Sequence, residues 1–331
     1  MKEQDREKIQ IVIPTYNCVD CIDRTMKSIA DQDYDGKKLY IVVVDFGSSD
    51  GTYEKLLTYS MTNLGVYQLP DSIIGTTMPA EANRLAGYTF PGGHNCQSVL
   101  LMPGDILYSN YISTCIDRMH EFKDEQPIAV ICEVDVERED GSIYSQKELY
   151  HHKQIIDGES QQIEYISSKI DHYVYRFGGG IATLKHRQSS AYNDWTWWSK
   201  SILMGQEQKI IYIPDRLACI QERYYEDELR EILLRWESII LYIRSYESKY
   251  REKADGDIER LSTRNLSFYA IWRSFLCYQR QNKVQAEACF KIAAIIDENI
   301  TEEGIYRKIG DLVLHDKTDL QDEIQRFFEQ I

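Results

Sequence analysis

A cluster of acidic, glycine and serine residues follows a short apolar run early in the chain. The sequence "IVVVDFGSSDGT" (41–52) passes from branched apolar residues directly into Asp45, Ser48 and their polar neighbours. A carboxylate and a hydroxyl at such a turn can hydrogen-bond to a polar ligand, and glycine lets a ligand approach the backbone closely. A buried strand does not need these residue types. The pattern therefore indicates a polar ligand held where a strand ends.

Two further polar turns follow apolar runs in the same part of the chain. Pro14–Asn17 follows "KIQIVIP", and Pro103–Asp105 follows "SVLLM". Apolar runs alternate with helical patterns over the first 105 residues, which predicts an α/β fold with a mostly parallel sheet and helices on both faces. Ligands of such sheets lie beyond the carboxyl ends of the strands. We therefore expect the three turns to meet in one crevice.

The second half of the chain changes character. The segment "PIAVICEVDVEREDGSIY" (127–144) predicts two strands joined by a turn, and "KIIYIP" (209–214) predicts a last strand. From residue 227 onward, apolar residues recur with the 3.6-residue period of helices. The sequence thus predicts an α/β domain over residues 1–224 and a C-terminal helical appendage over residues 225–331.

The charge balance and the hydropathy pattern limit the partners. The 331 residues include 53 acidic and 38 basic side chains, a net charge of −15. This balance argues against a nucleic-acid partner, because binding phosphates requires clustered cations. The charged N-terminus has no apolar signal core, and no apolar run of about 18 residues follows. We expect a cytoplasmic protein without a transmembrane segment, either free or peripheral at the inner face of the membrane.

The eight cysteines are scattered along the chain. Without a secretory signal they are most simply reduced core residues. Only Cys18 and Cys21 have a motif spacing, C-x-x-C, between a predicted strand and a predicted helix. No second pair completes a zinc site, so this spacing leaves thiol redox chemistry as a separate hypothesis.

Six segments of the first two thirds of the chain carry recognisable motifs in a fixed order. They are "IVIPTYN", "SIADQDY", "YIVVVDFGSSDGT", "AEANRLAG", "LLMPGDILYSNYI" and "AYNDWTWWSKSILMGQEQKIIYIPDRLACIQER". With these motifs, residues 9–223 resemble family 2 glycosyltransferases of the GT-A fold, a Rossmann-like fold of enzymes that use nucleotide-diphosphate sugars. The helical tail lies outside this resemblance.

The resemblance implies a nucleotide-sugar donor, usually a UDP-sugar, and a divalent Mn²⁺ or Mg²⁺ ion. It also implies transfer with inversion to a hydroxyl of a saccharide or glycoprotein acceptor, as in the biosynthesis of bacterial surface polysaccharides. The residues expected to hold the nucleotide are Pro14, Tyr16, Asn17, Asp45, Ser48 and Asn83. Gly179, Gly180 and Trp195 are expected to face the donor or acceptor sugar.

Asp194 occupies the position of the family's catalytic base. A single carboxylate is enough to take the proton from an acceptor hydroxyl. Because Asp194 precedes a predicted helix, it could also serve as an N-cap, and the two roles are compatible.

The sequence departs from the family pattern at several positions. Phe46 follows Asp45 where the family has a second acid, so Phe46 either stacks on the base or fills the core. Met102-Pro103-Gly104 replaces the Asp-x-Asp metal motif and leaves only Asp105.

Three alternatives follow from the missing metal motif. Asp105 binds the metal alone, the enzyme works without a metal, or the site is inactive. The last of these motivates a second hypothesis, in which the chain is a catalytically inactive partner or scaffold that binds an active enzyme through its C-terminal helices.

Overall fold

The computed structural model divides the chain into two compact units, and we describe each by itself. The first unit comprises residues 1–159 and 173–222, and the second comprises residues 160–172 and 223–331. The structure describes residues 8–69, 78, 82, 85–86, 97–127, 129–148, 150, 154–157, 169, 174–178, 209–222, 224, 227–245 and 256–330.

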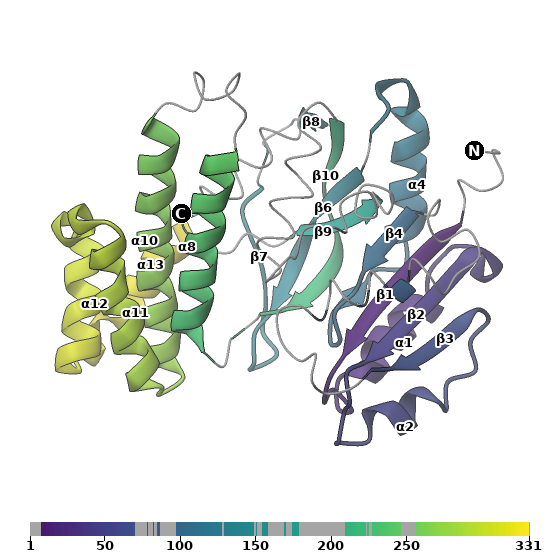
Figure 1. Ribbon diagram of the computed structural model, residues 1–331, viewed down its shortest axis with the longest axis horizontal. Coiled ribbons are helices and arrows are strands. Elements are labelled where there is room, and N and C mark those ends of the chain that lie inside the picture. Colours follow the sequence, from purple (N-terminus) through teal and green to yellow (C-terminus); the bar gives the residue numbers. More distant parts are fainter. Residues whose placement is uncertain are drawn as a thin grey trace. The chain divides into compact units, whose positions relative to one another are not determined.

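A mixed sheet forms the centre of the first unit (Figure 1). Its strands run in the spatial order β3-β2-β1-β4-β9-β6-β10-β5, with β7 paired to β6 and β8 paired to β10. Their bounds are Ile9–Thr15 (β1), Leu39–Asp45 (β2), Leu64–Gln68 (β3), Gln97–Leu100 (β4), Ile106–Leu107 (β5), Ala129–Glu137 (β6), Ile143–Ser145 (β7), Ile155–Asp157 (β8), Val174–Gly178 (β9) and Lys209–Gln221 (β10).

The four strands β3, β2, β1 and β4 are mutually parallel, as the alternating sequence pattern predicted. In the register of β1 and β2, Thr15 lies opposite Asp45, so these two strands end at the same level. Leu101, just beyond β4, donates its N–H to the carbonyl of Val12 at 2.9 Å. The carboxyl ends of β2, β1 and β4 therefore lie side by side.

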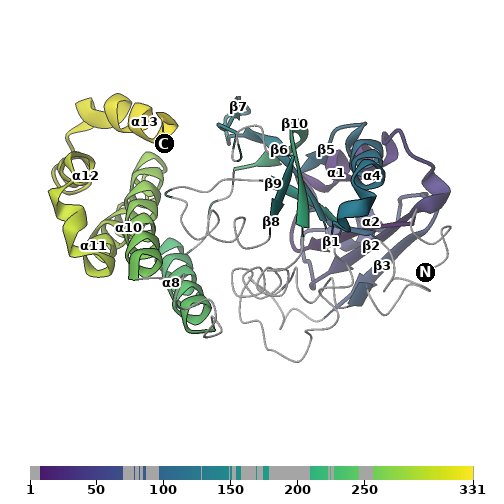
Figure 2. The same ribbon diagram turned by 90° about the horizontal axis from the view of Figure 1, so that it is seen from above.

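Both faces of the two strands β1 and β2 are buried, which explains why these strands are apolar nearly throughout. One face holds Ile9, Ile11 and Ile13 of β1 together with side chains of α1 (Ile22–Ala30), α2 (Thr52–Leu56) and α4 (Tyr111–Glu121). Helices α1 and α4 lie over the same side of the sheet (Figure 2). The opposite face packs Val12 of β1 against the helical residues 78, 82 and 86.

The last strand is longer than the sequence pattern predicted. Instead of ending at Pro214, β10 continues to Gln221, and its pairing with β6 shifts register on both sides of Arg216. A bulge of this kind accommodates a proline inside a strand, because the missing N–H falls where the ladder is already interrupted. The extension matters for the site, since Gln221 contacts the turn that follows β4.

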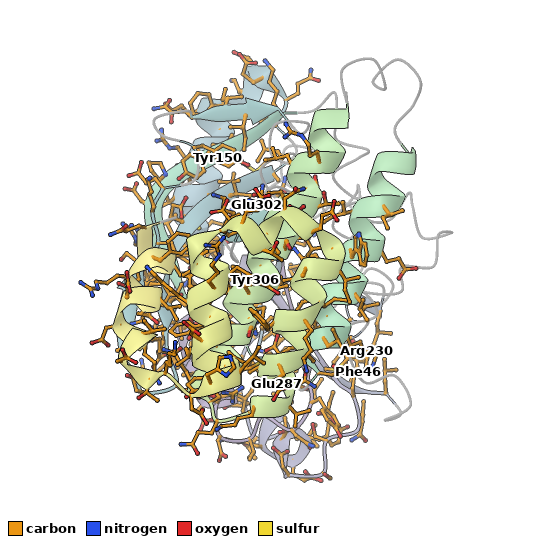
Figure 3. All side chains as sticks on the ribbon, turned by 90° about the vertical axis from the view of Figure 1, so that its left-hand side faces the viewer. Phe46, Tyr150, Arg230, Glu287, Glu302 and Tyr306 are labelled. Atoms are coloured by element: carbon orange, nitrogen blue, oxygen red, sulfur yellow. The ribbon has the colours of Figure 1, made fainter. Side chains whose placement is uncertain are left out.

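The described part of the second unit is helical. It contains α8 (Glu228–Ser245), α10 (Gly256–Gln279), α11 (Lys283–Ile296), α12 (Gly304–His315) and α13 (Gln321–Gln330). Helices α10 and α11 form a hairpin in which Ser274 donates its hydroxyl hydrogen to the carbonyl of Ala286 at 2.7 Å. Tyr306 of α12, labelled in Figure 3, stacks on Phe290 of α11 with ring centroids 4.4 Å apart.

A buried ion pair joins α8 to α10. Glu228 accepts from Arg273 Nε at 2.8 Å and also from Arg273 Nη2, and both side chains are almost fully buried. Arg235 is buried as well, with its guanidinium 3.9 Å from the ring centroid of Tyr269. Within the part of the chain that the structure describes, no helix is both long and apolar enough to cross a membrane.

Candidate functional site

Two loops at neighbouring strand ends form the candidate site. The first loop, residues 16–21, follows β1, and the second loop, residues 46–51, follows β2. Because the two strands are adjacent and end at the same level, these loops leave the sheet together. Polar residues that are 30 to 35 positions apart in sequence are thereby brought into direct contact.

Hydrogen bonds hold the two loops against each other. Asn17 donates its N–H to Ser48 Oγ at 2.9 Å and accepts from the N–H of Ser49 at the same distance. One residue further on, Cys18 donates its N–H to Thr52 Oγ1 at 2.9 Å. Val19 donates its N–H to a carboxylate oxygen of Asp50 at 3.0 Å. We refer to these four hydrogen bonds as the loop clasp.

Asp45, the last residue of β2, holds the second loop through hydrogen bonds. It is fully buried and accepts hydrogen bonds from Thr15 Oγ1 at 3.2 Å, Ser48 N at 3.0 Å, Ser48 Oγ at 2.5 Å and Gln68 Nε2 at 3.3 Å. A carboxylate has about four lone-pair sites, so these donors fill its capacity. A ligand that hydrogen-bonds to Asp45 must displace one of them, and Gln68 makes the longest of the four bonds.

Tyr16 and Gly47 shape the surface of the two loops. Tyr16 is 36% exposed, so its ring can contact a ligand. Gly47 has φ +75°, in the left-handed region that favours glycine. Asn17 also has positive φ, at +46°, and its side chain compensates by accepting the Ser49 N–H described above.

Phe46 fills the core. Its side chain is fully buried and packs with Val12, Val42 and Val44 on the sheet face opposite α1. The sequence left two roles open for Phe46, stacking on the nucleotide base or filling the core. In the structure Phe46 fills the core. The second acid of the family pattern is therefore replaced by a core residue.

The turn after β4 is fastened to α1 and β10. Gly104 donates its N–H to Thr25 Oγ1 at 2.9 Å, and Thr25 donates its hydroxyl hydrogen to the carbonyl of Asp105 at 2.8 Å. Asp105 is 1% exposed, and its Oδ1 accepts from the N–H of Gln221 at 3.0 Å. The carboxylate thus links two elements that lie 116 residues apart.

These surroundings do not fit a divalent-metal site. A hard cation needs several oxygen ligands, and one oxygen of Asp105 already accepts from a backbone N–H. Among the described residues, no group of three or more His, Cys, Asp or Glu side chains could hold a metal ion. We therefore derive no step through a metal bound at Asp105.

The remaining predicted site residues lie outside the described part of the chain. They are Asn83, Gly179, Gly180, Asp194 and Trp195. Pro14 is described, and it lies buried in β1 opposite Val44. The roles that the resemblance gave to these residues stay predictions.

Sequence reasoning missed three residues that organise this region. Thr15 and Gln68 hydrogen-bond to Asp45 at the end of β2, and Thr25 hydrogen-bonds to the turn after β4. Thr15 and Gln68 are polar residues at the last position of apolar strands, a signal that could have drawn attention to them. Thr25 carries no such signal, because a threonine inside a helix is ordinary until its partners are known.

Comparison with known proteins agrees with this architecture. The profile of the family described as "Glycosyl transferase family 2" matches residues 10–69, which span β1 to β3 and both loops. No curated protein sequence matches the chain.

Several solved structures share the fold. One is TarS residues 1–349 from S. aureus in complex with UDP-GlcNAc, which is 14% identical with a TM-score of 0.54. That alignment covers 89% of this chain and 92% of the TarS chain. Another is the mannosyltransferase PcManGT from Pyrobaculum calidifontis in complex with GDP-Man and Mn²⁺, 17% identical with a TM-score of 0.52. This alignment covers 94% of the present chain and 88% of the PcManGT chain.

The family match is confined to 60 residues, and the solved structures at these identities establish the fold alone. The first finding compares sequences, and the second compares backbone geometry. Together they confirm that this chain resembles family 2 glycosyltransferases of the GT-A fold, and they support glycosyltransferase function.

Proposed function

We propose that the chain transfers a sugar from a nucleotide-sugar, a UDP-sugar in the first instance, to a hydroxyl acceptor with inversion at the sugar carbon. The observation that carries this proposal is the loop clasp at the carboxyl ends of β1 and β2. It fixes a polar surface at the sheet edge where ligands of parallel sheets bind.

The clasp suits a nucleoside diphosphate. The exposed ring of Tyr16 offers a face for the base, and Gly47 leaves the backbone of the second loop open to close approach. The carboxylate of Asp45 is a hydrogen-bond acceptor, and the side-chain amide of Gln68 lies beside it. An N–H of the nucleotide base or a hydroxyl of the ribose can replace Gln68 as a donor to Asp45. TarS has been solved with UDP and with UDP-GlcNAc, which favours a nucleotide-sugar as the ligand class.

The chemical step requires a base for the acceptor hydroxyl. We assign this role to Asp194, on its place in the motif order that the sequence shares with the family. Its carboxylate takes the hydroxyl proton while the oxygen attacks the sugar carbon, and the nucleoside diphosphate leaves from the opposite side. Asn83 is assigned to the nucleotide, and Gly179, Gly180 and Trp195 to the sugars.

The charge of the leaving diphosphate also has to be stabilised. PcManGT was solved with Mn²⁺ and GDP-Man. In this chain Met102-Pro103-Gly104 stands in place of the metal motif, so we propose that any Mn²⁺ or Mg²⁺ is held mainly by the diphosphate itself. Mg²⁺ can bind through one or two carboxylates together with phosphates and waters.

The alternative is an inactive glycosyltransferase-like protein that serves as a partner or scaffold. Two observations favour it, namely the lost metal motif and the engagement of Asp105 with Gln221. In this case the C-terminal helices would provide the surface for the partner.

Titration calorimetry with UDP, in the presence and absence of Mn²⁺, distinguishes the two functions. The enzyme is expected to bind UDP and to hydrolyse a UDP-sugar slowly without acceptor, whereas failure to bind at millimolar UDP would support the scaffold. The same titration with GDP in place of UDP tests which nucleobase the protein prefers.

Asp194→Asn tests the assignment of the base. We expect it to abolish transfer while the affinity for UDP stays within about twofold, because a base acts on the acceptor and not on the nucleotide. Equal loss of transfer and of UDP affinity would instead make Asp194 a structural cap.

A further inference from the structure

A pair of thiols lies directly beside the loop clasp. Cys18 accepts backbone hydrogen bonds at its carbonyl from Cys21 N at 3.1 Å and Ile22 N at 3.0 Å, so a helical turn already begins at Cys18, ahead of α1. In such a turn the first and fourth residues have neighbouring side chains. The Cys21 thiol donates to the Cys18 carbonyl oxygen at 3.6 Å, which holds it against the first residue of the turn.

The two thiols are not equivalent. Cys18 is buried, whereas Cys21 is partly exposed. Interaction with the Cys18 thiol, together with the nearby guanidinium of Arg24, lowers the pKa of Cys21 to about 7, although burial and the carboxylate of Asp105 act in the opposite direction. The same contact and its burial raise the pKa of Cys18. An accessible thiolate beside a buried partner is the arrangement that favours thiol–disulfide exchange.

A second thiol pair in the described residues provides a contrast. The thiols of Cys277 in α10 and Cys289 in α11 also shift each other's pKa, but both side chains are buried. Interaction between two thiols is thus common to both pairs, and access to solvent distinguishes them. A small oxidant can reach Cys21 in the native fold and cannot reach the second pair.

We propose that Cys18 and Cys21 form a reversible intramolecular disulfide by exchange with a low-molecular-weight disulfide such as oxidised glutathione. The Cys21 thiolate attacks one sulfur of glutathione disulfide, which forms a mixed disulfide and releases one glutathione thiolate. Cys18 then loses its proton and attacks the Cys21 sulfur, which closes the protein disulfide and releases the second glutathione. The protein pair loses two electrons and two protons, and glutathione disulfide gains them as two thiols.

This bond would act on the loop clasp. The N–H groups of Cys18 and of the adjacent Val19 are clasp donors to Thr52 and Asp50. Side chains three residues apart in a helical turn have Cβ atoms about 5–6 Å apart, whereas a disulfide needs about 3.5–4.5 Å. Closing the bond therefore pulls the first loop toward α1 and weakens the hydrogen bonds to the second loop.

The experiment incubates the full-length protein in glutathione redox buffers and maps its disulfides by mass spectrometry. We expect a Cys18–Cys21 bond that dithiothreitol reverses, while Cys277 and Cys289 stay reduced. Hydrogen exchange at Cys18 and Val19 should be faster in the oxidised form by about tenfold, the effect of losing one hydrogen bond. Unchanged exchange, a glutathione adduct that never resolves, or equal oxidation of the buried pair would overturn the proposal.

Two variants make the assignment specific. Cys18→Ser should trap glutathione on Cys21 as a stable mixed disulfide, because the resolving thiol is gone. Cys277→Ser is the matched control, since it removes one thiol from the buried pair and should leave the Cys18–Cys21 bond unchanged. A Cys18→Ser protein that takes up no glutathione would refute the role of Cys21 as the attacking thiol.

Disulfide mapping and hydrogen exchange are both independent of glycosyl transfer. A weaker affinity for UDP in the oxidised form would be a further consequence, and it rests on the proposed function. If neither form binds UDP, that function fails while the disulfide and its effect on hydrogen exchange can still be measured.

Discussion

Glu231 in the first turn of α8 provides a sharp test of the energetics of the helical unit. Its side chain is buried, and burial raises its pKa from an ordinary value of 4.5 to about 7, with Glu228 and Asp227 adding to the effect and Arg230 and Arg273 opposing it. A carboxyl whose pKa is higher in the folded state binds its proton more tightly there. Below about pH 4.5 Glu231 therefore does not lower the free energy of unfolding, because it is protonated in both states. As the pH rises from there through 7, the free energy of unfolding falls.

The size of the penalty follows from the shift. One pKa unit corresponds to about 1.4 kcal/mol, so ionised Glu231 costs the fold about 3 kcal/mol at pH 8 and under about 1 kcal/mol at pH 5. Glutamine has the same shape and no charge. We expect Glu231→Gln to stabilise the helical unit by about 3 kcal/mol at pH 8 and by much less at pH 5.

The assay is urea unfolding of the full chain at both pH values. Pulsed hydrogen exchange of the α8 and α10 peptides follows the helical unit separately from the first unit. Glu237→Gln is the control, because Glu237 is exposed on the same helix and the substitution removes the same charge. Equal stabilisation at pH 5 and pH 8, or the same gain from Glu237→Gln, would refute the reasoning.

Three further predictions concern the strand-end turns. Thr25→Val should destabilise the first unit by about 2–3 kcal/mol in chemical unfolding, because the buried N–H of Gly104 and carbonyl of Asp105 lose their partner; an unchanged midpoint would contradict this. Gly104→Ala should lower the melting temperature more than Gly51→Ala. Both glycines have φ near +90°, but a Cβ at Gly104 would lie 2.1 Å from Gln221 Oε1, whereas Gly51 faces open space. Equal shifts would mean that Gln221 moves aside freely. Asp45→Asn should speed hydrogen exchange across residues 46–51, because the amide nitrogen cannot accept from Ser48, and unaltered exchange would show that Asp45 does not organise this loop.

The sequence predicted the part of the fold that depends on local pattern. Runs such as "IQIVIP" and "YIVVVD" are apolar on both faces, which marks buried parallel strands, and the polar residues after them mark the strand ends. The motif order predicted the GT-A fold, and the family and structure comparisons confirm that resemblance. The bulged extension of β10 beyond Pro214 was not predicted, because only pairing with β6 shows that the strand continues.

For the site, the order of residue types was enough to predict which residues stand at the strand ends and which family motif is missing. The contacts of those residues depend on the folded arrangement of the strands. Asp45 meets Gln68, Phe46 enters the core, and Asp105 meets Gln221 because strand order and register bring them together. Neighbours in sequence interact through fixed spacing, but a hydrogen bond between positions 105 and 221 exists only after the whole sheet has formed. That is why the link that Asp105 makes between the β4 turn and the last strand could not be predicted from the sequence.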